Sequence, residues 1–421
     1  MTAGRLGIVA DDLTGALDSA APFAASGYSV YVPLNPSEPG AFAHDVVSIT
    51  TESRALPPDD AAEAVRRVVR RLSSDGRWVY KKIDSLLRGN VGPEAAAAAE
   101  TCGAEVVLAA PAFPAQGRTV VGGRVYVHGR DLADALRDAD PLVGGGAGSV
   151  QAAFAGLQEA VLIPLAEVRR GPEAVLGRLN QLSGAVAVAD AERDEDMAVL
   201  ARAVLSCVPR VMPCGSAGLA TALASEMGRN YSACAEAAPW SRGVVRPVLV
   251  VVGSQSAVSA DQVSRLRRRA GVAVVELRAA ELDSAGARSA AGELAAALGR
   301  GGMVVLLLTG VRELVDAARE AGTEAALTAH IAKRMGEIAA LALERQPAGA
   351  LVLTGGATAM GVLGALGCVG LEVLGEAASG VPVSRAVGGL ADGVWVVTKA
   401  GAFGGPSLLC DITAMLGGAD G

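Results

Sequence analysis

A cluster of charged residues in the stretch Val79–Gly92, which reads VYKKIDSLLRGNVG, could both bind an anion and accept a proton. Lys81, Lys82 and Arg88 could hold an anion, while Asp84 could take a proton from a hydroxyl group. The residues just before them are strand formers, so the charges come at the end of a predicted strand. Open α/β sheets bind ligands at that end of their strands. The alternative is a solvated loop whose charges neutralise one another.

A second group of charges follows the first apolar stretch of the chain. Leu6–Ala10 predicts a buried strand, and Asp11 and Asp12 come directly after it. Asp12 or Thr14 could cap the helix that follows, but two adjacent carboxylates exceed what one cap needs, which favours a functional role. Arg54, in the sequence TESR, lies just beyond another predicted strand, where it is either a surface residue or placed to bind a carboxylate.

Three glycine-bearing turns follow strands in the second half of the chain. They read VVVGSQS at 250–256, TGGATAMG at 354–361 and KAGAFGG at 399–405. Backbone N–H groups at helix N-termini attract anions, so these turns together with Lys399 indicate a site for nucleotide phosphates. None of them matches GxxxxGK[ST], which excludes a P-loop, and none matches GxGxxG, which disfavours an NAD(P)-dependent dehydrogenase.

The elements that must position these residues are short apolar strands alternating with helices, in both halves of the chain. This alternation predicts α/β domains with mainly parallel sheets. A length of 421 residues favours two such domains. Because Glu226–Pro247 shows no periodicity, we predict a first domain over 1–228, a linker over 229–246 and a second domain over 247–421.

Composition excludes several classes of protein. With 37 Lys and Arg against 44 Asp and Glu, the net charge of −7 argues against a nucleic-acid binder, although a small anionic ligand needs only a local basic cluster. The six cysteines form no CxxC pair, which disfavours structural zinc and favours a reducing compartment. The short apolar run at the N-terminus and the absence of a membrane-length run predict a cytoplasmic protein with no signal peptide and no membrane partner.

Along nearly its whole length the chain resembles the four-carbon acid sugar kinase family. The matching motifs, in order, are IVADDLTGALD, TESR, KKIDSLLRGN, PAFPAQGR with RVYVHG, GSAGLA, VVVGSQS, TGGATA and TKAGAFG. The resemblance implies a sugar-acid-binding first domain, a nucleotide-binding second domain and an active site in the interdomain cleft. Members of the family use ATP to phosphorylate the terminal hydroxyl of threonate, erythronate or 3-oxo-tetronate. A homodimer is left open.

The resemblance also implies roles for individual residues. Those that it places on the sugar acid are Asp11 or Asp12, Arg54, Lys82, Ile83, Asp84 and Ser85. Those that it places on ATP are Ser254, Gly355, Gly356, Ala357, Thr358, Lys399, Ala400 and Gly401. Mg²⁺ is implied by ATP chemistry, since the sequence shows no cluster of metal ligands.

Phosphoryl transfer needs in-line positioning, neutralisation of the γ-phosphate and a base near the attacking hydroxyl. The candidates to hold the substrate carboxylate or the developing charge are Arg54, Lys82 and Arg88. For the base they are Asp84 and Asp12. Three residues depart from the family pattern: Leu17 replaces an Asn, Leu86 a Thr and Ala357 an acidic residue. The last two leave open an alternative, a catalytically weakened relative that binds the metabolite.

Overall fold

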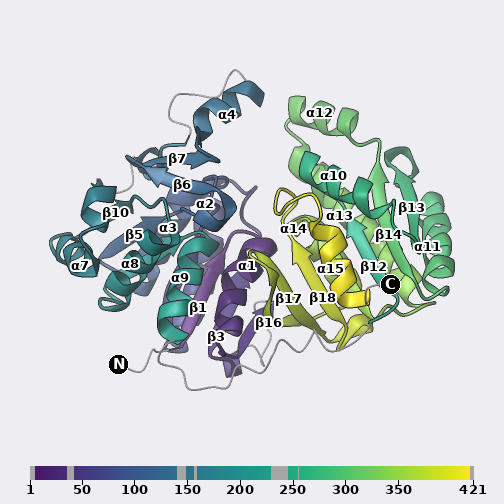
Figure 1. Cartoon of the computed structure of the whole chain (residues 1–421), viewed down its shortest axis with the longest axis horizontal. Coiled ribbons are helices and arrows are strands. Elements are labelled where there is room, and N and C mark those ends of the chain that lie inside the picture. The colour runs from purple at the N-terminus through teal and green to yellow at the C-terminus, as the bar shows by residue number, and fades with distance from the viewer. Residues whose placement is uncertain are drawn as a thin grey trace. The chain divides into compact units, whose positions relative to one another are not determined.

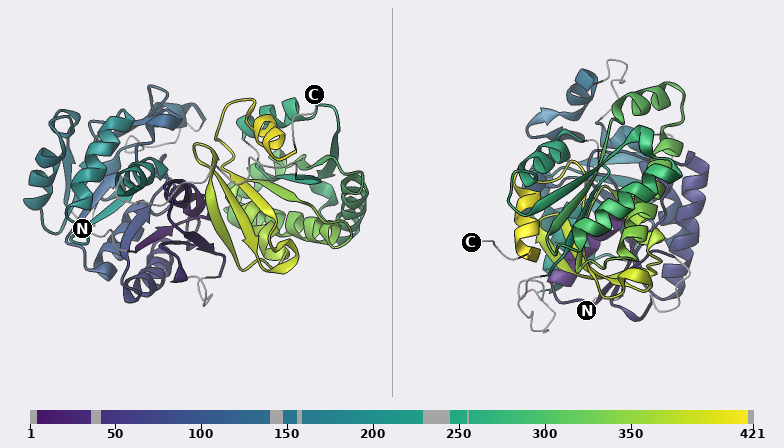
Figure 2. Two further views of the ribbon diagram at one scale, coloured as in Figure 1. Left: turned by 60° about the horizontal axis from the view of Figure 1, so that its bottom comes forward. Right: turned by 90° about the vertical axis from the view of Figure 1, so that its right-hand side faces the viewer.

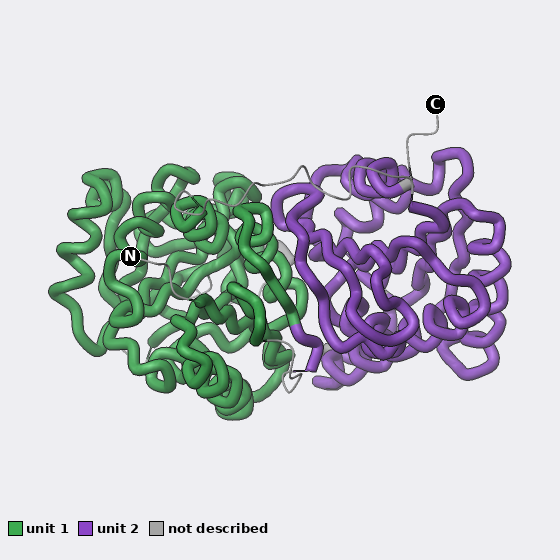
Figure 3. The backbone as a smooth tube through the Cα atoms, turned by 90° about the horizontal axis from the view of Figure 1, so that it is seen from below, with its two compact units in different colours: residues 1–32, 39–234 green, residues 33–38, 235–421 purple. Residues whose placement is uncertain are grey.

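The computed structural model describes residues 5–35, 42–139, 148–155, 159–228, 245–254 and 256–417 (Figure 1). The chain forms two compact units, Met1–Val32 with Pro39–Cys234 and Pro33–Glu38 with Ala235–Gly421 (Figure 3). Each unit is built on a sheet flanked by helices, which confirms the prediction of two α/β domains with mainly parallel sheets. Apart from residues 245 and 246, the predicted linker over 229–246 lies outside the described residues.

Within the described residues, the sheet of the first unit has eight strands, and every neighbouring pair is parallel. In spatial order the strands are β2 (Val30–Pro33), β3 (Val46–Thr50), β1 (Leu6–Ala10), β4 (Trp78–Lys82), β11 (Val211–Gly215), β5 (Val106–Ala110), β10 (Ala185–Ala189) and β9 (Glu159–Ile163). Strands β2, β3, β1, β11, β5 and β10 are buried at every residue, and β4 is buried at every residue except Trp78. Burial on both faces explains why they read as continuous apolar runs rather than as an alternating pattern.

Helices cover this sheet, and α1 packs against α9 while α2 packs against α3. The helices of the unit are α1 (Leu13–Ala25), α2 (Pro58–Ser74), α3 (Val91–Cys102), α4 (Leu132–Ala139), α5 (Val150–Ala153), α6 (Leu165–Val168), α7 (Pro172–Asn180), α8 (Asp194–Leu205) and α9 (Ala217–Gly228), with a 3₁₀ turn at Pro114–Gln116. A small antiparallel sheet is formed by β6 (Arg118–Val121), β7 (Arg124–Val127) and β8 (Arg130–Asp131).

In the part of the second unit that the structure describes, the sheet has five parallel strands followed by an antiparallel edge. In spatial order the strands are β13 (Val272–Arg278), β14 (Met303–Thr309), β12 (Val248–Val252), β15 (Ala350–Thr354), β18 (Trp395–Lys399), β17 (Val381–Val387) and β16 (Gly370–Ala378). The hairpin of β16 and β17 is a feature that the sequence analysis missed. Its glycines and exposed positions interrupt the apolar run that identified the other strands.

Helices lie on both faces of the second sheet, with α10 and α15 on one and α11, α13 and α14 on the other (Figure 2). The helices of the unit are α10 (Ala257–Leu266), α11 (Ser284–Leu298), α12 (Arg312–Glu320), α13 (Glu324–Leu343), α14 (Gly356–Ala365) and α15 (Leu408–Gly417), with 3₁₀ turns at Ala279–Glu281 and Gly389–Ala391. Val263, Leu409 and Ile412 pack on the sheet in a core of buried valines and leucines. Among the residues described, none of the helices is long and apolar enough to cross a membrane.

Candidate functional site

The carboxyl ends of three neighbouring parallel strands bring the predicted charges of the first unit together. Strand β1 lies between β3 and β4, with Ala10 opposite Thr50 and Val9 opposite Lys81. The residues that follow these strands therefore emerge at one edge of the sheet. The backbone N–H groups of Ser53 and Arg54 both donate to the carbonyl of Asp11, which fixes the turn after β3 against the turn after β1.

Arg54 forms the centre of this cluster, because it pairs with both aspartates after β1. Its Nε and Nη2 donate to the two carboxylate oxygens of Asp11 at 2.7 and 2.9 Å, and its Nη1 donates to Asp12 Oδ2 at 2.7 Å. Its Nη2 also lies 3.9 Å from Asp84 Oδ1. The guanidinium that we predicted to clamp a substrate carboxylate is thus engaged by carboxylates of the protein itself.

Asp11 and Asp12 occupy different environments although they are adjacent. Burial raises the pKa of Asp11, but the hydrogen bond and charge of Arg54, together with Lys81 and Lys82, outweigh it and hold that pKa below its ordinary value. Asp12 is the N-cap of α1, and its Oδ1 accepts a hydrogen bond from the N–H of Gly15 at 2.7 Å. Asp12 therefore caps the helix and pairs with Arg54 at the same time, so the two roles weighed for it are compatible.

Asp84 lies in a loop where it accepts hydrogen bonds from Arg88 and from the backbone. Arg88 Nε and Nη2 donate to its two oxygens at 2.8 and 2.7 Å, and the N–H of Leu86 donates at 3.1 Å. Burial raises the pKa of Asp84, but the hydrogen bond and charge of Arg88, with Arg54 and Lys82, lower it well below its ordinary range. The carboxylate is therefore ionised at neutral pH. Its partner Arg88 has a side chain that is 59% exposed.

Lys82 points into the first unit and meets a carboxylate that the sequence analysis did not single out. Its Nζ lies 3.7 Å from Oδ1 of Asp18 on α1, and both residues are buried. Burial lowers the pKa of Lys82, but Asp18 and the aspartates near it raise it above its ordinary value. Burial raises the pKa of Asp18 to about 6, although Lys82 acts against this shift. An aspartate on the apolar inner face of a predicted helix was the available signal, since such residues are rarely buried unpaired.

The neighbouring Lys81 serves a different purpose, because it is fully buried on the other side of β4. Its Nζ lies 2.8 Å from Glu94 Oε2 and also donates to the carbonyl of Lys82. The other oxygen of Glu94 accepts from Ser53 Oγ at 2.7 Å. This buried chain of contacts connects α3 and the turn after β3 to β4. Lys81 therefore has a structural role.

The remaining predicted residues of this loop are buried beside the cluster. Ile83 and Ser85 are 2% and 6% exposed, and the N–H of Ile83 donates to the carbonyl of Gly215. A further cation is Arg118, at the start of β6 and 6% exposed. Burial lowers its pKa, while Asp84 acts to raise it, which shows that Arg118 lies within electrostatic reach of the loop. It belongs to the PAFPAQGR motif, which was quoted in the sequence analysis without a role.

In the second unit, the three glycine turns follow strands that are neighbours. Val252, Thr354 and Lys399 are directly opposite one another in β12, β15 and β18, so the turns begin at the same edge. A Cβ atom at Gly253 would overlap Thr358 Oγ1, and one at Gly401 would overlap Ser254 Oγ. A side chain at either position would have to displace the neighbouring hydroxyl, so glycine suits the close approach of one turn to the next.

The turn after β15 and the turn after β12 each open a helix. Gly355 is the N-cap of α14 with φ +98°, a conformation that favours glycine, and Ala357 is exposed in the first turn of that helix. Ser256 caps α10 by accepting from the N–H of Ser259. A hollow of about 530 Å³ extends from Ser254 between α10 and the end of β14, and its walls include Val263 and Leu308.

The sequence analysis predicted that Lys399 contacts nucleotide phosphates, but its side chain does not extend from the turn. Its side chain is fully buried, and Nζ donates to the carbonyls of Ala400, Gly401 and Phe403 at 2.9, 3.2 and 3.2 Å. The lysine therefore lies beneath the loop that follows it. The reason is local, because the loop folds back over the end of β18 and presents carbonyl oxygens to the ammonium group.

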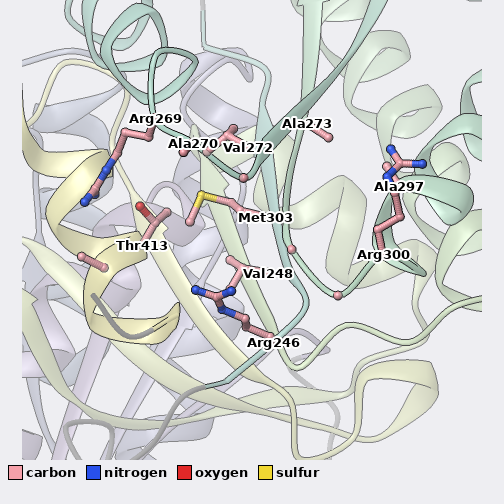
Figure 4. Close-up of a pocket in the computed structure, with 14 residues that line it drawn as sticks. Arg246, Val248, Arg269, Ala270, Val272, Ala273, Ala297, Arg300, Met303 and Thr413 are labelled. Carbon is pink, nitrogen blue, oxygen red and sulfur yellow. The ribbon is translucent and has the colours of Figure 1, made fainter. Parts of the chain in front are cut away.

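Another hollow, of about 640 Å³, lies at the opposite edge of the second sheet (Figure 4). The first residues of β12, β13 and β14 line it together with Arg246, Arg269 and Arg300. Arg269 donates to the carbonyl of Cys410 and Arg300 to that of Ala296. This hollow lies at the amino ends of the strands, so it is separate from the glycine turns, which follow the carboxyl ends where parallel α/β sheets bind ligands.

Two family models match successive parts of the chain. Residues 6–223 match a family model described as a sugar-binding N-terminal domain, and residues 249–409 match one described as a nucleotide-binding C-terminal domain. A D-threonate kinase of Salmonella typhimurium is 34% identical, with 96% of each chain covered. A D-threonate kinase of Bordetella bronchiseptica is 35% identical, with 96% of this chain and 95% of the relative covered.

The fold is also found in a solved structure. A crystal structure of a Salmonella typhimurium LT2 protein superposes with a TM-score of 0.78 at 22% identity, covering 98% of this chain and 99% of the other. That likeness concerns the fold alone. Family membership is shown by the sequence matches: the two family models and the two relatives that are more than 30% identical over nearly the whole chain. By these matches, the chain belongs to the four-carbon acid sugar kinase family.

Proposed function

We propose that this protein is an ATP-dependent kinase that phosphorylates the terminal hydroxyl of a four-carbon sugar acid. The observation that carries the proposal is the cluster around Arg54, where buried carboxylates and cations meet at the carboxyl ends of β1, β3 and β4. Such a cluster suits a small ligand with one carboxylate and several hydroxyls. D-threonate is the first candidate substrate, because two relatives that cover nearly the whole chain are D-threonate kinases.

In this proposal the cations of the first unit have different roles in binding the sugar acid. Arg88 has the most exposed side chain among these cations, so its guanidinium can bind the substrate carboxylate while it stays paired with Asp84. Arg118 would assist it from β6. Arg54 would act by holding the carboxylates of Asp11 and Asp12 towards the sugar hydroxyls, which changes the role that the sequence suggested for it.

For the chemical step, Asp84 or Asp12 would orient the attacking hydroxyl and accept its proton. Phosphoryl transfer passes through a loose transition state, so positioning of the hydroxyl matters more than a strong base. The low pKa of Asp84 is compatible with this task, because an ionised carboxylate can accept the hydroxyl hydrogen throughout the neutral pH range. The raised pKa of Lys82 keeps its positive charge available to the transferring phosphoryl group.

The glycine turns of the second unit would bind the phosphates of ATP through backbone N–H groups. The residues proposed for this are Ser254, Gly355, Gly356, Ala357, Thr358, Ala400 and Gly401. The hollow beside Ser254 could take the nucleoside, with Val263 and Leu308 among its apolar walls. Mg²⁺ would be held largely by phosphate oxygens and water, with Asp11 or Asp12 as carboxylate ligands of suitable chemistry.

The test is an assay of the purified protein with ATP, Mg²⁺ and a panel of threonate, erythronate and 3-oxo-tetronate stereoisomers. We expect ADP to form only with a sugar acid present, and phosphorus NMR to show a phosphate monoester on the terminal carbon. Absence of ADP with every acid, combined with measurable binding of an acid by calorimetry, would establish the metabolite-binding alternative instead. Oxidation or reduction of the acid in the presence of NAD(P) would contradict both readings.

A further inference from the structure

The loop Ala400–Gly405, which follows β18, is held by its carbonyl oxygens. Lys399 Nζ donates to the carbonyls of Ala400, Gly401 and Phe403 at 2.9–3.2 Å. An ammonium group has three donors, so this set uses its full capacity. Burial lowers the pKa of Lys399 to about 8, so the group is still mostly protonated at neutral pH.

Side chains of α10 bind the same face of the loop. Ser256 Oγ and Ser259 Oγ donate to the carbonyl of Gly401 at 2.7 and 2.9 Å. Gln262 Nε2 lies within 2.8–3.3 Å of the carbonyls of Phe403, Gly404 and Gly405. The carbonyls of all residues from 400 to 405 except Ala402 thus accept hydrogen bonds from buried or half-buried side chains.

The orientation of the carbonyls decides the orientation of the amide groups. In a trans peptide the C=O and N–H bonds point in opposite directions, so these contacts turn the N–H groups of Gly401, Ala402, Gly404 and Gly405 away from Lys399 and α10. The N–H of Phe403 instead donates to the carbonyl of Ala400, and residue 406 is a proline, which has no N–H. Successive N–H groups on the outer face of a glycine-rich loop form a concave site that attracts anions. Gly401 packs against Ser254, which places the loop beside the turn after β12.

We propose that Lys399 is a positioning residue for nucleotide binding, which holds the loop 400–405 with its N–H groups towards the ATP phosphates and does not itself contact them. The inference depends on the proposed binding of ATP by the second unit. It differs from the phosphate-ligand role expected from the sequence, because a direct contact would require Nζ to leave three carbonyls and become exposed.

The test compares Lys399→Met with Gln262→Leu, which removes a neutral residue that holds the same carbonyls. Binding of a non-hydrolysable ATP analogue to each purified variant is measured by calorimetry, so the result does not depend on kinase turnover. We expect both variants to bind the analogue at least about tenfold more weakly, and hydrogen exchange of peptides covering 400–405 to rise in both. In the kinase assay, KM for ATP should rise more than KM for the sugar acid.

Two outcomes would overturn the inference. If Lys399→Met weakens binding of the analogue while Gln262→Leu binds as the parent does, the lysine acts through its charge or by direct contact. If neither variant changes binding, the loop does not carry the phosphates. Should Lys399→Met fail to fold, Gln262→Leu still tests the inference, because binding equal to that of the parent overturns it, while weaker binding with faster exchange of 400–405 supports it. If the parent protein itself does not bind the ATP analogue, that result contradicts the proposed function rather than this inference.

Discussion

Replacing Arg54 with alanine should cost both stability and activity, because this residue holds two carboxylates together. It donates three hydrogen bonds of 2.7–2.9 Å to Asp11 and Asp12, and Asp11 is only 3% exposed. Removing one partner of a buried ion pair costs about 3–5 kcal/mol, since the other charge stays buried. The Arg54 side chain is 27% exposed, so water can enter the space it leaves. We therefore expect the free energy of unfolding to fall by about 3 kcal/mol.

The pH dependence of this loss follows from Asp11. In the parent protein the pKa of Asp11 is lowered, so its carboxylate contributes stability that is present above the ordinary pKa and is lost as the pH falls. In Arg54→Ala the burial remains and the main opposing interaction is gone, so the pKa of Asp11 should rise above its ordinary value. The folded variant then takes up a proton more readily than the unfolded chain, and its deficit should shrink between pH 7 and pH 5.

Urea denaturation of the parent and of Arg54→Ala at both pH values measures this deficit. The double variant Arg54→Ala/Asp11→Asn should be more stable at pH 7 than Arg54→Ala alone, because it removes the unpaired charge. Arg66→Ala is the matched control: this half-buried arginine pairs with Glu63 and Glu100, which are both exposed, and its loss should cost less than about 1 kcal/mol. A deficit for Arg54→Ala that stays below about 1 kcal/mol, or that is equal at both pH values, would refute the reasoning.

Three other substitutions test separate parts of the site. Asp84→Asn keeps the shape of the side chain, so it should fold normally while kcat falls by roughly 10²–10⁴-fold; a kcat within a factor of a few would transfer the role to Asp12. The parent should lose activity as the pH falls below about 6, where Asp18 takes up a proton and Lys82 loses its nearest carboxylate, and Asp18→Asn should lack this limb of the pH profile. Identical pH–activity profiles for the parent and for Asp18→Asn would show that Asp18 does not cause the loss of activity at low pH. Ala357→Asp should change kcat/KM for ATP by less than about tenfold, because the first turn of α14 offers backbone N–H groups whatever side chain it carries; a gain of about a hundredfold would show that the protein is a weakened kinase.

The residues that follow strands were predictable because a parallel sheet places all its carboxyl ends at one edge. Asp11, Asp12, Arg54 and the loop from Lys82 were each identified as charges after an apolar run, and they do meet in the first unit. The glycine turns after β12, β15 and β18 meet in the second unit for the same reason. The hairpin of β16 and β17 was missed, since antiparallel edge strands with glycines and exposed positions do not form continuous apolar runs.

The sequence by itself determined the two α/β domains and the strand ends that carry charge, because hydrophobic periodicity and glycine placement are local properties of the chain. It did not determine which charge would pair with which. Arg54 pairs with Asp11 across 43 positions in the chain, and Lys82 lies beside Asp18, because β1 is inserted between β3 and β4. Lys399 turns inward because the loop after it folds over β18 towards α10. Strand order, register and loop direction arise from packing between distant segments, so only the tertiary structure decided what these side chains contact.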